Sequence, residues 1–277
     1  MYIYSYDNNV FSIKDKGLTI VKADRGRQVG IIPYYIQDGI VLKNILKICC
    51  NDDADFILTD SNKVYYIESY ADKPIEDYMK KLWTDIKDFS VSQTGLCYIN
   101  MNSDLYYYNH LLYPIDKRKI EYKQIIPMFI SNDVKIAKLY LYEIYYLTHD
   151  GSLYKYRPLF KVNQVGSDVD FAEPVQYIKE QIIKSNVNNF SISNSHIFVL
   201  DKEFRLAIYN KHTYEGGYIL NNDNYVLAKD IYSFGQTVLY MDLSHNLWQL
   251  HDDMTVEHIA ENVFTAYVNE NGNYFYI

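Results

Sequence analysis

The stretch EIYYLTHDGSLYKYR, from Glu143 to Arg157, decides the fold. It has the form of a β-hairpin, because two apolar runs, Ile144 to Leu147 and Leu153 to Tyr156, flank a polar turn that contains Asp150 and Gly151. A single hairpin of this kind would be weak evidence for any architecture. Its value lies in its recurrence along the chain.

The apolar residues on either side of this turn, Leu147 and Leu153, are separated by five mostly polar residues. The same interval recurs at Tyr4/Val10, Leu58/Val64, Ile99/Leu105, Leu200/Leu206, Met241/Leu247 and Val268/Tyr274. A short hydrogen-bonding residue suited to entering a turn follows the first apolar residue in every copy. An aromatic residue follows the second one in all copies but the fifth, which has Ala207. We interpret the seven copies as an internal repeat.

Further strands are expected on both sides of the hairpins. A leader strand precedes several of them, as in the segment from Asp88 to Ser92, and a fourth strand is expected after them, as in Val175–Ile183. The segment Lys73–Trp83 has a helical spacing of apolar residues and predicts a short helix or an irregular segment. The hairpin strands are apolar on both faces, so each sheet must be covered on both sides. This favours an all-β fold, a β-propeller of four-stranded antiparallel blades.

The number of blades follows from the spacing of the hairpins. Successive hairpins are 54, 41, 48, 53 and 41 residues apart, and the last interval is only 27 residues, which is too short for four strands. We therefore expect the hairpins at the two ends, Tyr2–Ile13 and Phe264–Ile277, to share one blade and close the ring. This gives six blades in a single domain, residues 1–277. The alternative is seven blades with a thin last one.

Composition limits the classes of function. Lysine and arginine number 27 and aspartate and glutamate 35, giving a net charge of −8, which makes a nucleic-acid partner unlikely on electrostatic grounds. The odd number of cysteines, three, predicts a reducing intracellular compartment. No apolar stretch is long enough to span a membrane, so a membrane is not expected as a partner. The 31 tyrosines, with abundant Asn, Ile and Lys, indicate an AT-rich source such as a large DNA virus, in which case the compartment is the host cytoplasm or the virus particle.

Motifs for catalysis or ligand binding are missing from the sequence. It contains no Gly-rich phosphate loop, HExxH helix or GxSxG elbow, and we predict no catalytic, cofactor-binding or metal-binding residues. Partner-binding loops are the remaining candidates, since loops on a rigid scaffold carry most binding sites. One is the acidic turn and the other is the longest connector, Lys161–Ser185, which we expect to be a loop insertion. Their candidate residues are Asp52, Asp53 and Asp55 in the first and Asp168 and Asp170 in the second.

The repeat resembles the RCC1-like propeller repeat, named after the regulator of chromosome condensation. The clearest matches are FGQTVLYMDLSHNLW (Phe234–Trp248), FSVSQTGLCYINMNSDLYYYN (Phe89–Asn109) and YYLTHDGSLYKY (Tyr145–Tyr156). The family's glycine and histidine positions are retained only at Gly235 and His196, and its turn glycine at Gly151 and Gly272. The resemblance covers nearly the whole chain and implies a propeller that presents loops to a partner.

Three functions follow, in order of preference. The first is a non-enzymatic scaffold that binds another protein through propeller-face loops, with the acidic loops complementing a basic partner surface. The second, implied by the resemblance, is a guanine-nucleotide exchange factor for a small GTPase, although the loops on which that activity depends have no match here. The third is a hydrolase with carboxylates at the channel mouth.

Overall fold

The computed structural model describes residues 2–6, 9–14, 17–22, 45–50, 54–68, 80–92, 95–109, 127–165, 168–221, 223–268 and 274–276. All regular elements among them are β-strands. By its internal contacts the chain divides into two compact units. One comprises Met1–Lys47 and Asn186–Ile277, and the other Ile48–Ser185.

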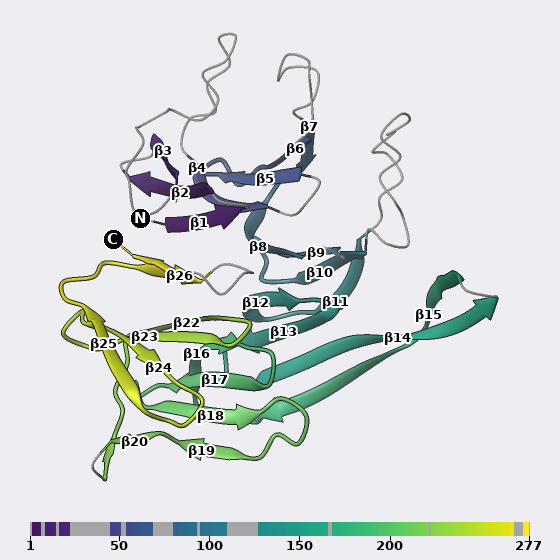
Figure 1. Cartoon of the computed structure of the whole chain (residues 1–277). Coiled ribbons are helices and arrows are strands. Elements are labelled where there is room, and N and C mark those ends of the chain that lie inside the picture. Colours follow the sequence, from purple (N-terminus) through teal and green to yellow (C-terminus); the bar gives the residue numbers. More distant parts are fainter. Residues whose placement is uncertain are drawn as a thin grey trace. The chain divides into compact units, whose positions relative to one another are not determined.

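Five sheets have four strands each, joined in sequence order as antiparallel meanders (Figure 1). Their strands are β4 (Ile45–Cys50), β5 (Ala54–Thr59), β6 (Val64–Glu68) and β7 (Lys80–Trp83); β8 (Ile86–Ser92), β9 (Gly95–Asn100), β10 (Leu105–Asn109) and β11 (Met128–Ser131); β12 (Val134–Tyr140), β13 (Glu143–Thr148), β14 (Leu153–Val165) and β15 (Asp168–Ile183); β16 (Val187–Ile192), β17 (His196–Asp201), β18 (Leu206–Asn210) and β19 (Gly216–Tyr218); and β22 (Asp230–Phe234), β23 (Thr237–Met241), β24 (Leu247–Leu250) and β25 (Val256–Ala260). This arrangement confirms the all-β propeller with four-stranded antiparallel blades, each made of a leader strand, a hairpin and an outer strand.

The expected ring of six or seven blades is seen only in part. The described residues contain five four-stranded blades, not six or seven. The terminal strands form two separate sheets, β1 (Tyr2–Tyr6), β2 (Asn9–Lys14) and β3 (Gly17–Lys22) in one and β26 (Ala266–Val268) and β27 (Tyr274–Tyr276) in the other. No ladder joins the two sheets among the described residues, although β1 and β26 contact each other. A further hairpin, β20 (Leu220–Asn221) with β21 (Asn224–Tyr225), follows β19.

The strand β13 shows why blades must pack against one another. Its residues Ile144, Tyr145, Tyr146 and Leu147 are all completely buried, although successive side chains of a strand point to opposite faces. Ile144 and Tyr146 pack into a core that the blade beginning with β12 shares with the blade beginning with β8. A second core of this kind joins the blades that begin with β16 and β22. The expectation that both faces of the hairpin strands are covered is therefore confirmed, and neighbouring blades provide this cover.

One turn recurs in all five blades. The residue that enters it donates its backbone N–H to the carbonyl four positions later, as Asn100 does to Asp104 at 2.9 Å, and accepts from the N–H three positions later, here Ser103 at 3.0 Å. The residue at that third position has a positive φ in every blade: Asn62, Ser103, Gly151, Phe204 and His245. In four of the five blades, the carbonyl of this residue accepts a hydrogen bond from a backbone N–H at or just before the start of the next leader strand. Asn62, for example, accepts from Ile86 at 3.0 Å. The turn thus links one blade to the next.

The apolar residues that mark the repeat face each other across the ladder in six of the seven hairpins, as Leu147 faces Leu153. The first hairpin is the exception, because Ser5 pairs with Val10 and Tyr6 with Asn9. The N-terminal hairpin therefore matches the repeat in sequence interval but not in the register of its two strands.

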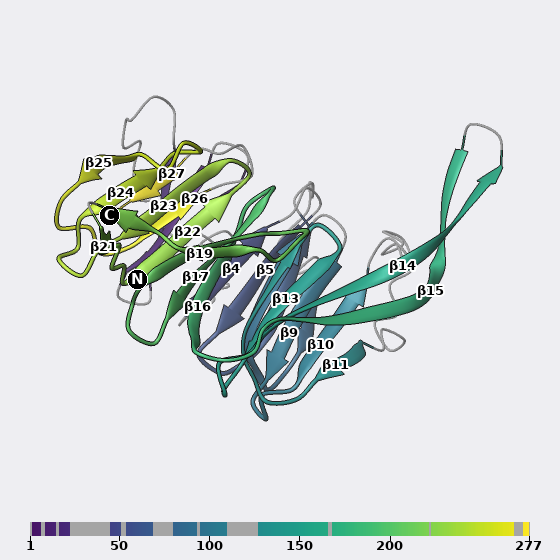
Figure 2. The ribbon, with the colours of Figure 1, turned by 90° about the horizontal axis from the view of Figure 1, so that it is seen from below.

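Two expectations about connecting segments were wrong. The segment Lys161–Ser185 is not a loop insertion, since β14 and β15 form a long hairpin arm that extends beyond the rest of its own blade (Figure 2). The expected strand Val175–Ile183 is the inner half of β15. Helical spacing at Lys73–Trp83 was also misleading, because Lys80–Trp83 pairs with β6 as a strand, and residues 73–79 lie outside the described part of the chain. In both places cross-strand pairing prevailed over local pattern.

Candidate functional site

The acidic residues expected to bind a partner are placed as follows. Asp52 and Asp53 lie outside the described residues, and Asp55 is in β5, opposite Ile67. Asp168 and Asp170 belong to β15 near the end of the hairpin arm, where they pair with Val165 and Asn163. The structure does not bring these two groups to one described surface. They remain predictions about binding.

A different surface is the best candidate site. Five large apolar or aromatic residues, each between 40% and 54% exposed, lie along the chain from 204 to 227: Phe204, Tyr218, Leu220, Tyr225 and Leu227. Two of their rings flank the side chain of Arg205, whose guanidinium carbon lies 4.7 Å from the centroid of Tyr218 and 5.3 Å from that of Tyr225. We call these six residues the Arg205 platform. Exposed apolar side chains near an arginine that is stacked on tyrosine rings are typical of a protein contact surface.

The backbone around Leu206 builds this platform. Its N–H donates to the Val226 carbonyl at 2.8 Å, and its carbonyl accepts from Ile219 at 2.8 Å, so two segments on either side of the β20–β21 hairpin are held beside β18. Ile219 and Val226 are buried, which anchors the hairpin, while Leu220 and Tyr225 face each other on it and are exposed. Tyr218 and Tyr225 meet edge to face, with ring centroids 5.2 Å apart.

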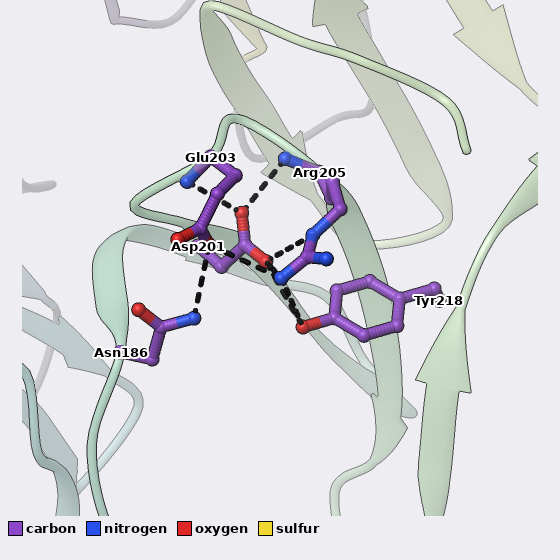
Figure 3. A network of polar contacts seen from close by, with 5 residues as sticks. All are labelled: Asn186, Asp201, Glu203, Arg205 and Tyr218. Carbon is purple, nitrogen blue, oxygen red and sulfur yellow. Dashed lines mark hydrogen bonds and ion pairs between the residues drawn. The ribbon is translucent and has the colours of Figure 1, made fainter.

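A polar network fixes the orientation of Arg205 (Figure 3). Its Nε donates to Asp201 Oδ2 at 2.6 Å, and its Nη2 forms an ion pair with the same oxygen, also at 2.6 Å. Nη2 donates a hydrogen bond to Glu203 Oε2 at 3.1 Å. The Tyr218 hydroxyl accepts from Arg205 Nη2 at 3.2 Å and donates to Asp201 Oδ2 at 2.9 Å. Asn186 donates to Glu203 Oε2 at 3.2 Å. Because several bonds converge on Arg205, its side chain is held against the two tyrosine rings.

The same contacts keep the network charged. Burial acts to raise the pKa of Asp201, but hydrogen bonds from the Arg205 backbone, the Arg205 guanidinium and the Tyr218 hydroxyl outweigh it, so the pKa of Asp201 is lowered from its ordinary value. The hydrogen bond to Asp201 raises the pKa of Arg205. Burial, followed by the bond to Asp201, raises the pKa of Tyr218. At neutral pH Asp201 and Arg205 therefore form an ion pair and Tyr218 is a neutral hydroxyl.

Part of this network is ordinary turn chemistry. Asp201 Oδ1 accepts the N–H groups of Glu203 and Arg205 at 2.9 Å, and Asn100 and Asp242 accept in the same way in their own turns. What is particular to this blade is the residue at the positive φ position. Phe204 has a φ of 63° and is 40% exposed, whereas Asn, Ser, Gly or His stands there in the other blades. A bulky residue in this conformation is uncommon and costs about 1–2 kcal/mol.

One sequence signal could have indicated this site. The fifth hairpin is the copy in which Ala207 replaces the aromatic residue after the second apolar position. In the structure Ala207 pairs with Tyr218 on the outer strand β19. In this blade an aromatic ring is therefore found on the outer strand, opposite the position where the hairpin lacks one. The second ring, that of Tyr225, could not be predicted from the sequence, because it contacts Tyr218 only through the β20–β21 hairpin.

Other kinds of site find no support in the described part of the chain. Within the residue ranges given above, no group of three or more His, Cys, Asp and Glu side chains is arranged to hold a metal ion. None of those residues forms a helix long and apolar enough to cross a membrane.

The fold is a β-propeller that exposes apolar and aromatic side chains near Arg205, and this fold was compared with known proteins. No protein-family model and no curated protein sequence matches the chain. Among solved structures, Prp20p from Saccharomyces cerevisiae is similar with a TM-score of 0.56 and 10% identity, over 80% of this chain and 66% of Prp20p. Prp20 is yeast RCC1.

Two other solved structures share the fold. Human WBSCR16 is similar with a TM-score of 0.51 and 12% identity over 82% of this chain and 68% of that one. PorZ from Porphyromonas gingivalis is similar with a TM-score of 0.61 and 10% identity over 99% of this chain, which spans 35% of PorZ. At such identities the likeness shows the fold alone. At that level the resemblance to RCC1-like propellers is confirmed.

Proposed function

We propose that this protein is a non-enzymatic interaction module that binds another protein through the Arg205 platform. The observation that carries the proposal is the combination of exposed rings with a strained Phe204. Natural turns favour glycine or asparagine at a positive φ, because a large side chain there is costly. The other blades form the same turn with Asn62, Ser103, Gly151 or His245 at this position, so the turn itself does not require a phenylalanine, and strained positions of this kind cluster at functional sites.

The experiment compares four forms of the protein in affinity capture from the native host, with mass spectrometry of the bound proteins. The forms are wild type, Tyr225→Ser, Phe204→Asn and the matched control Tyr142→Ser, whose tyrosine is 42% exposed but lies in the other unit. We expect a set of proteins that wild type and Tyr142→Ser retain and both platform variants lose. If all four forms capture the same proteins, the platform is not the binding surface.

A stability measurement accompanies this comparison. Phe204→Asn removes a half-buried ring but relieves a strained backbone, and the two effects are each about 1–2 kcal/mol and opposite in sign. Urea unfolding should therefore show a free energy of unfolding within about 1 kcal/mol of wild type, against the 3–5 kcal/mol typical of losing a core phenylalanine. A loss in that larger range would mean that Phe204 has a structural role instead.

A guanine-nucleotide exchange factor is the second candidate. It is favoured by the likeness to Prp20p, the crystal structure of which was described with its binding to Gsp1p and histones. The test is nucleotide release from a panel of small GTPases of the host. Accelerated release from one of them would support exchange activity, and failure to bind any of them would exclude it.

We also propose that the terminal strands complete a sixth blade. β26 packs against β22 and β23 as β22 packs against β16 and β17. Asn262, just before this segment, has a positive φ, as Asp133 and Asn186 have before β12 and β16. The Val263 N–H donates to the His245 carbonyl, just as residues at the start of other leader strands donate to the turn of the preceding blade. β26 thus occupies the position of a leader strand, and β1 contacts it.

A further inference from the structure

We propose that the Arg205 platform recognises a segment of the partner in which an arginine or lysine lies next to an apolar residue. This inference rests on the function proposed above and specifies the chemistry of the partner. It is carried by three features: the two carboxylates that bind Arg205, the exposed part of the Tyr225 ring and the aliphatic side chains beside it.

Two carboxylates share one guanidinium at the centre of the platform. Asp201 and Glu203 both bind Arg205, at 2.6 Å and 3.1 Å. Arg205 therefore neutralises only one of the two carboxylates. Asp201 is almost completely buried, but the Glu203 side chain is 59% exposed, and its Oε1 has no hydrogen-bond partner among the described residues. The excess charge is thus presented at an atom that a partner can reach.

The rings of the platform already hold one cation. Arg205 lies over both Tyr218 and Tyr225, within the distance at which the face of an aromatic ring attracts a positive charge. Tyr225 is half exposed, so part of its surface remains open to solvent. In the proposed complex a second cation, supplied by the partner, contacts this exposed part and pairs with Glu203. Ring and carboxylate then favour the same group.

The aliphatic residues determine what flanks that cation. Leu220 pairs with Tyr225 on the β20–β21 hairpin, and the backbone of Leu227 pairs with that of Arg205 in an isolated antiparallel β-bridge. Both leucines are exposed, at 54% and 43%, and burying them against an apolar side chain would contribute hydrophobic free energy that a charged neighbour would not. An acidic or phosphorylated segment would bring its charge to Asp201 and Glu203, where repulsion opposes binding. A basic residue beside an apolar one fits both parts of the surface.

The test uses a displayed library of random peptides selected on the whole protein and counter-selected on Tyr225→Ser. We expect the enriched peptides to share an arginine or lysine within two positions of an apolar residue. One enriched peptide is then synthesised, together with a form in which glutamine replaces the basic residue, and fluorescence anisotropy measures both affinities. Against the basic peptide, Glu203→Gln should weaken binding about two- to fivefold, with a smaller effect on the glutamine form. Tyr142→Ser should change neither.

The outcomes separate this inference from the proposed function. Enrichment of acidic or uncharged peptides that still lose binding with Tyr225→Ser would overturn the inference and leave the interaction surface intact. Equal binding of the basic and glutamine peptides, or no response to Glu203→Gln, would do the same. If host proteins are captured equally by wild type and Tyr225→Ser, the proposed function fails, and the inference fails with it.

Discussion

Asp201 shows how one side chain serves both fold and site. Its Oδ1 accepts two backbone N–H groups within the turn, as the corresponding Asn100 and Asp242 do, and its Oδ2 holds Arg205 and Tyr218. The sequence predicted the first role, since a short hydrogen-bonding residue enters the turn in every copy. The second role depends on Arg205 and on a tyrosine seventeen residues away, and no local pattern indicates it.

Replacing this carboxylate tests both roles through pH. The folded state lowers the pKa of Asp201, so its contribution to stability is fully present above the unfolded pKa, about 3.9, and is lost as pH falls through the folded value. At pH 7 we expect Asp201→Asn to be less stable than wild type by about 1.5–3 kcal/mol, the range for hydrogen bonds to charged groups. Below pH 4 the difference should shrink. Urea unfolding at a series of pH values measures it.

Glu203→Gln is the matched control for this experiment. Its carboxylate also binds Arg205 but is largely exposed, so the stability of that variant should stay close to wild type across the same pH range. A difference between wild type and Asp201→Asn that is constant from neutral to acidic pH would contradict the proposed ionic role of Asp201.

At the scale of elements, the strand β19 positions Tyr218 through a close backbone approach. A Cβ at Gly216 would overlap the carbonyl oxygen of Ile208 on the neighbouring strand and lie 2.7 Å from Tyr209 Cα. These are backbone atoms, so the strands must separate to make room. The next residue, Gly217, has open space around its Cβ direction.

Alanine substitutions at these two glycines form a matched pair. We expect Gly216→Ala to destabilise the protein by about 1–3 kcal/mol, as other overpacking changes do, and to weaken partner binding by displacing Tyr218. Gly217→Ala should leave the stability and the binding nearly unchanged. Thermal unfolding and the capture experiment provide the two readouts. Equal effects of the two substitutions would mean that the approach of β19 to β18 is not as close as the structure has it.

For the whole molecule, the ends of the chain matter most. Val263, Ala266 and Val268 are buried against Leu239, Met241 and Leu247 of the preceding blade. A chain that stops at Asn262 would expose this apolar face. Each large side chain that loses its cover costs about 1.5–3 kcal/mol, so we expect a loss of several kcal/mol.

Chemical unfolding of the truncated chain, compared with a chain in which only Tyr274–Ile277 is removed, tests the proposed sixth blade. The shorter deletion leaves Val263 to Val268 in place and should be milder. If both truncations leave the unfolding midpoint of wild type unchanged, the terminal strands do not complete a blade and the described five stand without them.

The sequence by itself determined the repeat, the β-hairpins, their turns and the burial of strands on both faces. These properties depend on residues within a few positions of one another, such as Leu147 and Leu153 across one turn. The tertiary structure alone decided the number of complete blades, the extended pairing of β14 with β15 and the platform around Arg205. Each of these needs contacts between segments far apart in the chain, and the backbone bonds that Leu206 makes to Ile219 and Val226 leave no local periodicity to read.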